Sequence, residues 1–129
     1  MGERWTKINL DEVEDAAPGN SVGERWEARV AREPLDASRT GLTHFRLRPG
    51  RRSPFNHRHR EAEEVYVILA GDGLVKLGDE IRPVLPLDAI RIAPEVPRAF
   101  EAGPDGLEFM AFGVHHEADG EPVEDDWVE

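Results

Sequence analysis

The sequence predicts an all-β fold in which antiparallel strands form a barrel or a sandwich. Segments with period-two alternation of apolar and polar residues recur along the 129-residue chain. Clusters of Gly, Pro, Asn and Asp separate these segments at intervals of about eight to twelve residues, which is typical of small β-barrels. No stretch keeps a helical period beyond about two turns. Hydrophobic residues make up 39% of the chain and charged residues 33%, so the chain can bury one ordinary core.

The first elements are an N-terminal lead-in segment and two strands. Residues 1–27 contain a weakly alternating acidic stretch and a Pro-Gly-Asn loop, and we expect them to precede the barrel. Residues 26–32 and 43–48 alternate apolar and polar side chains, which predicts strands with one solvent-facing side. His44 shares the polar face of the second strand with two arginines, so we expect its ring to be exposed.

The central strand is predicted at residues 65–69, which are apolar on both faces. One face would fill the barrel interior, and the other needs cover from a second sheet or a second subunit. We therefore expect a homodimer. A hairpin turn is expected at Gly71 and Gly73, followed by a strand at residues 74–77 that ends at Gly78.

Two further strands complete the predicted barrel, at residues 90–92 and 107–114. The barrel domain is therefore expected at residues 28–114. An acidic C-terminal tail, residues 115–129, follows it. Trp127 lies among the carboxylates of this tail, and we expect its indole to dock on the barrel or on the partner subunit.

Two histidines and a glutamate form the candidate functional site. His57 and His59 lie two residues apart, so on an extended strand their side chains point to the same face. Glu64 can join them from the next strand. Two imidazoles and a carboxylate are good ligands for a divalent transition metal, and three ligands leave coordination positions open for chemistry.

The same region resembles the first motif of the cupin superfamily. Gly50, His57, His59, Glu64 and Gly71 fit that motif, with one extra residue between Gly50 and His57. The resemblance covers roughly residues 28–114. It implies a small single-domain cupin of the "cupin 2" type, with a cupin jelly roll, or double-stranded β-helix barrel, that commonly dimerises. It also implies that the two histidines and the glutamate are the metal ligands.

The second cupin motif is only partly present. Pro94 matches it, but Arg98 stands where the motif has a histidine that is normally a further metal ligand. A guanidinium is always charged and cannot ligate a metal. Two arrangements therefore stay open. Arg98 forms an ion pair with Glu64 and leaves the pocket metal-free, or it binds a substrate carboxylate or phosphate beside a metal ion such as Fe, Mn, Ni or Zn.

Strand parity brings two aromatic residues to the same pocket. If Glu64 points inward, so does Tyr66, and if Arg98 points inward, so does Phe100. Arg98, Tyr66 and Phe100 are therefore candidate substrate-binding residues for a small anionic molecule, with plain core packing as the alternative for the two aromatic rings. Residues 46–60 also carry six arginines, which either steer an anionic ligand or pair with the acidic tail.

Composition excludes several classes of site and partner. The net charge of −11 argues against a nucleic-acid or anionic-membrane surface. The absence of cysteine excludes thiol nucleophiles, disulfides and thiolate metal sites. No apolar run approaches the roughly 18 residues that span a bilayer, and no signal segment opens the chain, so a cytoplasmic location is expected. No P-loop or dinucleotide fingerprint is present, so we expect no nucleotide cofactor.

Two functions stay open at this point. The first is a small metal-dependent enzyme with dioxygenase or isomerase-like chemistry, which the cupin resemblance allows because one fold hosts many reactions. The second is a metal-free, non-catalytic protein that binds a small molecule. The sequence does not decide whether the chain is an enzyme.

Overall fold

The computed structural model describes residues 4–17, 23–54 and 56–123. These residues form one short 3-10 helix and eight β-strands. Their bounds are η1 Leu10–Glu12, β1 Trp26–Val30, β2 Thr40–Leu47, β3 Asn56–His59, β4 Glu64–Leu77, β5 Glu80–Val84, β6 Ala89–Ile92, β7 Arg98–Val114 and β8 Gly120–Val123. The prediction of an all-β fold is confirmed. No helix in the described part of the chain could cross a bilayer.

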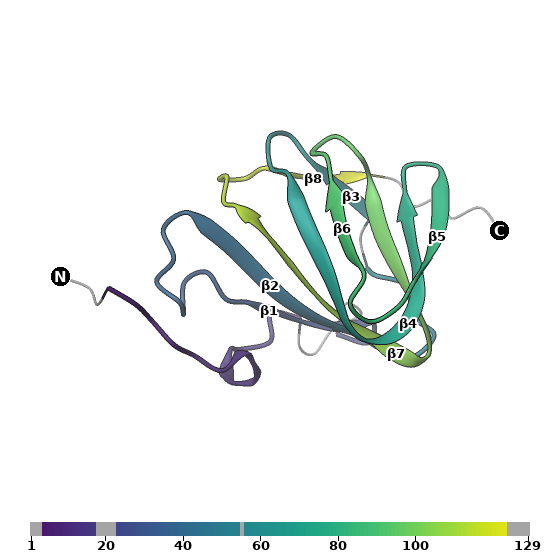
Figure 1. Ribbon diagram of the computed structural model, residues 1–129, viewed down its shortest axis with the longest axis horizontal. Helices are drawn as coiled ribbons and strands as arrows, with labels where there is room; N and C mark the ends of the chain where they lie inside the picture. Colours follow the sequence, from purple (N-terminus) through teal and green to yellow (C-terminus); the bar gives the residue numbers. More distant parts are fainter. Residues whose placement is uncertain (1–3, 18–22, 55, 124–129) are drawn as a thin grey trace.

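The strands form one curled, barrel-like sheet in which the long strand β7 pairs with β2, β3 and β4 (Figure 1). One path of hydrogen-bonded neighbours runs β1-β2-β7-β3-β8, and β4 pairs with β5, β6 and β7. All of these pairings are antiparallel. The ladder between β4 and β7 runs from Val65 opposite Phe112 to Leu77 opposite Arg98, so the two strands pair along most of their length.

Strand β4 supplies part of the core. Its side chains alternate as the period of two requires, with Tyr66 and Ile68 only 2% and 0% exposed. Val65, Val67 and Leu69 point to the other side and are half-buried. The strand predicted at residues 65–69 is therefore apolar on both faces, with one face in the core.

A row of stacked aromatic rings fills the barrel interior. Phe109 lies 5.0 Å from Phe45 and 4.4 Å from Phe100 between ring centroids, and Tyr66 lies 5.1 Å from Phe100. These rings come from β2, β4 and β7, so they tie together the strands that carry or adjoin the candidate site.

The hairpin turn predicted at Gly71 and Gly73 is wrong. Strand β4 runs through both glycines, and the pairing with β7 shifts register there instead. A Cβ atom at Gly73 would lie 2.1 Å from the carbonyl oxygen of Glu101, so only glycine allows the two backbones to approach this closely. The chain reverses at Gly78, between β4 and β5.

The prediction that His44 is exposed is also wrong. The residue is 4% exposed, and its Nε2 atom lies 2.6 Å from Glu108 Oε2. Arg46, on the same face of β2, pairs with Asp11 of the N-terminal segment at 2.9 Å. This ion pair holds the N-terminal segment against the face that the alternation pattern assigned to solvent.

Strand β8 lies within the segment that the sequence analysis assigns to the acidic tail. It pairs with β3, with His57 opposite Pro122 and His59 opposite Gly120 (Figure 1). Glu121 of β8 also pairs with Arg60 at 2.9 Å, so part of the arginine-rich stretch does contact this acidic segment. Trp127 lies outside the described residues.

Candidate metal-binding site

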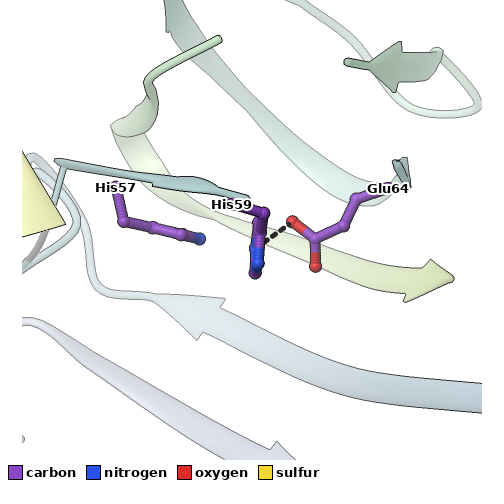
Figure 2. Close-up of side chains that lie close together, drawn as sticks. All are labelled: His57, His59 and Glu64. Carbon is purple, nitrogen blue, oxygen red and sulfur yellow. Dashed lines mark ion pairs between the residues drawn. The ribbon is translucent and has the colours of Figure 1, made fainter. Parts of the chain in front are cut away.

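The structure brings the three predicted ligand residues together. His57 and His59 project from the same face of β3, and Glu64 reaches toward them from the start of β4 (Figure 2). One ligand atom from each residue lies within 4.8 Å of the others. The two imidazole rings are 5.2 Å apart between centroids and nearly perpendicular, at 81°. This is the convergence that the two-residue spacing predicts.

His59 lies at the centre of the cluster. Its Nε2 atom is 3.0 Å from Glu64 Oε1, and its Nδ1 atom is 3.3 Å from Asp119 Oδ2. Neither contact has the direction of a hydrogen bond, so both ring nitrogens are buried without a hydrogen-bond partner among the described residues. Buried polar atoms without partners are uncommon, and each requires a physical explanation.

His57 is held in its neutral form. Burial lowers the pKa of its imidazole to about 4, and the positive charge of Arg98 acts in the same direction. The nearby Glu64 carboxylate opposes this shift without cancelling it. Near neutral pH the ring therefore has a free lone pair, as a metal ligand requires.

Glu64 is held in its ionised form. Burial acts to raise the pKa of its carboxyl group, but the contacts with His59, Arg98 and Tyr66 outweigh burial and lower the pKa. Oε1 accepts hydrogen bonds from Arg98 Nη1 at 2.7 Å and from the Tyr66 hydroxyl at 3.0 Å. The described residues make no hydrogen bond to Oε2, so this oxygen can still bind a metal.

Arg98 is fully buried, with 0% of its surface exposed. Besides its bond to Glu64, the guanidinium donates hydrogen bonds to the carbonyl oxygens of Ala93, Pro94 and Val96, at 2.9 to 3.3 Å. Of the two arrangements that the sequence leaves open, this geometry corresponds to the ion pair with Glu64. A role of Arg98 in binding a substrate stays a prediction.

Tyr66 and Phe100 lie beside this polar cluster, as strand parity predicts. Both are buried, at 2% and 3% exposure, and both belong to the hydrophobic core. Burial raises the pKa of the Tyr66 phenol well above its usual value, and the neighbouring Glu64 carboxylate adds to the shift, so the hydroxyl stays protonated and donates to Glu64. Their part in substrate binding stays a prediction.

Asp119 is a site residue that the sequence analysis missed. It is 7% exposed and lies in the turn between β7 and β8. Burial acts to raise the pKa of its carboxyl group, but backbone N–H donors of residues 60–62 outweigh burial and lower the pKa. The sequence offers no signal for this role, because Asp119 is one of seven carboxylates among residues 117–129.

A cavity of about 940 Å³ opens beside the site, and His59 and Glu64 form part of its wall. Part of the remaining wall is apolar, with side chains from the N-terminal segment, β1, β2 and β7. These apolar residues include Val13, Val30, Leu42, Phe112 and Val114.

The charged groups on the wall of the cavity are mostly acidic. The carboxylates are those of Glu14, Asp15, Glu33, Glu64, Glu117 and Asp119. Arg32 supplies the one guanidinium among the described lining residues, and neither Arg98 nor Phe100 lines the cavity.

Comparison with family models and with curated proteins finds no match to this chain. Solved structures do match. A sugar phosphate isomerase of the cupin superfamily from Silicibacter pomeroyi is 21% identical with a TM-score of 0.76, over 93% of this chain and 83% of that one. A polyketide cyclase from Streptomyces resistomycificus is 24% identical with a TM-score of 0.74, over 98% and 88%. A cupin-2 domain from Rhodospirillum rubrum is 19% identical with a TM-score of 0.72, over 96% and 84%.

These similarities establish the fold. The chain folds as a small single-domain cupin, a jelly roll of the double-stranded β-helix type. The resemblance that the His57, His59 and Glu64 motif predicts is confirmed at this level.

Proposed function

We propose that this cupin-fold chain is a metal-dependent enzyme that acts on a small molecule in the cavity beside His57, His59 and Glu64. The observation that carries the proposal is the convergence of a neutral imidazole, an ionised carboxylate and a second imidazole with both nitrogens buried and without hydrogen-bond partners. A bound metal ion would use the neutral imidazole and the ionised carboxylate as ligands, and it would give one ring nitrogen of His59 a partner.

The donor set indicates which ions fit. Two imidazole nitrogens and one carboxylate oxygen suit Fe, Mn, Ni or Zn in the divalent state, and three protein ligands leave positions for substrate. A metal bound there would act as a Lewis acid on a substrate oxygen. Tyr66 and Arg98 hold Glu64 Oε1 in place, 3.0 Å from His59 Nε2.

The lining of the cavity bears on the substrate. The sequence predicts an anionic substrate mainly through Arg98. The guanidinium of Arg98, however, already donates hydrogen bonds to Glu64 and to three carbonyl groups. The apolar and acidic wall favours a substrate with an apolar body and no net negative charge beyond the group that meets the metal. Two similar structures are named as enzymes, a sugar phosphate isomerase and a polyketide cyclase, which supports an enzymatic use of this fold.

The second candidate is a metal-free binding protein. The observation that favours it is the 2.7 Å ion pair between Arg98 and Glu64, because a carboxylate that already pairs with a guanidinium is a weaker metal ligand. In this case the cavity binds a small molecule and catalyses no reaction.

Metal analysis of the purified protein separates the two functions. The protein is prepared without an affinity tag and without added metal, and its metal content is measured by elemental analysis. About one transition-metal ion per chain is expected, and His57→Ala should lower this value at least tenfold. His116→Ala is the matched control, because His116 also lines the cavity but pairs with Glu61 at 3.3 Å. A wild-type protein that takes up no metal, even after incubation with Fe, Mn, Ni or Zn, would contradict the enzyme proposal.

A further inference from the structure

The carboxylate of Asp119 binds the loop between β3 and β4, the two strands that carry the candidate metal ligands. Its Oδ1 atom accepts hydrogen bonds from the backbone N–H groups of Arg60, at 3.2 Å, and Glu61, at 2.9 Å. Its Oδ2 atom accepts a third from the N–H group of Ala62, at 2.9 Å. Three successive backbone donors between His59 and Glu64 are therefore satisfied by one side chain from a distant part of the sequence.

The same carboxylate faces His59. Asp119 Oδ2 lies 3.3 Å from His59 Nδ1, on the side of the ring opposite Nε2, which lies 3.0 Å from Glu64 Oε1. A negative charge beside Nδ1 favours the tautomer that carries its proton there, whereas the Glu64 carboxylate beside Nε2 favours the other tautomer in the metal-free chain. The Nδ1–H tautomer leaves the lone pair on Nε2, which a metal ion bound together with Glu64 would need.

Strand pairing fixes Asp119 in this position. Gly120 lies opposite His59 and Pro122 lies opposite His57 in the β8–β3 ladder. Asp119 comes directly before that ladder, and Arg60 N–H also bonds to its backbone carbonyl at 3.1 Å. The short segment of residues 119–123 therefore runs along both histidines, and we call it the clasp.

We propose that Asp119 is a positioning residue for the metal site, and that the clasp is part of that site rather than a tail outside it. The proposal rests on the proposed function in so far as it concerns metal. Asp119 selects the Nδ1–H tautomer of His59 and fixes the plane of the ring, so that Nε2 is presented to the metal together with His57 and Glu64. Carboxylates behind ligating histidines act in this way in other metal sites, and their loss lowers metal affinity about 10- to 100-fold.

The test uses the full-length chain and two variants. Asp119→Asn removes the negative charge beside Nδ1 and keeps an oxygen that accepts backbone hydrogen bonds. Glu121→Gln is the matched control, because Glu121 lies in the clasp and its carboxylate pairs with Arg58 and Arg60, whereas among the described residues it forms no ion pair with His59. The first readout is the ¹⁵N chemical shift of the His59 ring nitrogens in metal-free protein at alkaline pH, where imidazole is neutral and its tautomer is visible. The second is the affinity for Co²⁺ from its visible absorption spectrum.

Wild-type protein and Glu121→Gln should both carry more of the His59 proton on Nδ1 than Asp119→Asn does. Asp119→Asn should shift the proton toward Nε2 and weaken Co²⁺ binding at least tenfold, while Glu121→Gln changes Co²⁺ affinity less than threefold. An unchanged tautomer and affinity in Asp119→Asn would overturn the proposal. If Asp119→Asn does not fold, the spectrum of wild-type protein with Zn²⁺ bound decides, because ligation of His59 through Nδ1 overturns the proposal.

The two readouts also separate this proposal from the proposed function. If wild-type protein binds no Co²⁺, the metal-dependent function fails, and the tautomer of His59 still shows whether Asp119 positions the ring. If wild-type protein binds Co²⁺ but Asp119→Asn changes neither readout, the metal site stands and the role of Asp119 is wrong.

Discussion

A single guanidinium connects the candidate site to the loop before β7. Arg98 is fully buried and donates to Glu64 and to three backbone carbonyl oxygens of residues 93–96. The interior tolerates this buried positive charge because Glu64 and the three carbonyl oxygens all accept hydrogen bonds from it. Its removal leaves an unpaired carboxylate and unsatisfied carbonyl groups in the interior.

We therefore expect Arg98→Met to destabilise the protein strongly. Loss of one partner of a buried ion pair costs about 3–5 kcal/mol, and the free energy of unfolding from urea denaturation should fall by this amount. Arg91→Met is the control, because Arg91 and Glu63 form an exposed pair at 3.3 Å, worth less than about 1 kcal/mol. Equal effects of the two variants would contradict the structural role of Arg98.

The site residues differ in how far the sequence predicts them. His57, His59 and Glu64 are predictable because the side-chain alternation of a strand fixes which neighbours share a face. Asp119 is not predictable, because its contact with His59 depends on the pairing of β3 with β8. These two strands are more than fifty residues apart in the sequence. The burial of His44 is missed for the same reason, since the covering segment is distant in the sequence.

At the scale of elements, close approach of β4 and β7 explains the glycines that the sequence analysis assigned to a turn. The alternation of apolar and polar residues locates strands reliably. Glycine, however, is common both in β-bulges and in hairpin turns, and the sequence does not distinguish the two. Short strands such as β5 and β8 contain proline and acidic residues, which is why their sequences gave no strand pattern.

We expect Gly73→Ala to destabilise the protein more than Gly78→Ala. The Cβ atom at position 73 would collide with the backbone of Glu101, and relief requires separation of two paired strands. At Gly78 no atom lies within 4 Å of an added Cβ, and only the φ of 61° is unfavourable. Backbone strain at Gly78 should cost about 1–2 kcal/mol, and the clash at Gly73 should cost more. Urea denaturation of both variants measures the difference.

The attachment of the N-terminal segment to β1 should depend on pH. Asp15 Oδ1 accepts hydrogen bonds from the N–H groups of Ala17 at 2.9 Å and Ala28 at 3.0 Å. Burial acts to raise the pKa of Asp15, but these two donors, together with the positive charges of Arg29 and Arg48, outweigh burial and lower the pKa below its usual value of 3.8. Because the folded pKa is the lower one, the stabilisation is fully present above the unfolded pKa and is lost as the pH falls through the folded pKa.

Asp15→Asn provides the test. Wild-type protein should be more stable than the variant near neutral pH, and the difference in the free energy of unfolding should shrink as the pH falls below about 3.8. Chemical denaturation across this range measures the difference. A gap between wild type and variant that does not change with pH would contradict the role of the Asp15 charge.

At the scale of the whole molecule, the outer face of β4 and β7 carries an apolar strip. Val65 lies opposite Phe112 and Val67 lies opposite Met110 in the ladder, and all four point away from the core formed by their neighbours. Phe112 is 37% exposed, and the others are half-buried. We infer that this strip is an interaction site.

We expect a second copy of the chain to cover this strip, and we expect the homodimer to depend on it. Sedimentation of wild-type protein at micromolar concentration should give twice the chain mass of 14.5 kDa. Val67→Glu places a charge in the middle of the strip and should yield a folded monomer, because burial of an unpaired carboxylate costs more than the strip gains. Leu85→Glu is the control, because Leu85 is 59% exposed, lies in the loop between β5 and β6 and is not one of the four strip residues. This variant should remain a dimer, whereas a wild-type protein that sediments as a monomer would show that the strip has another partner or none.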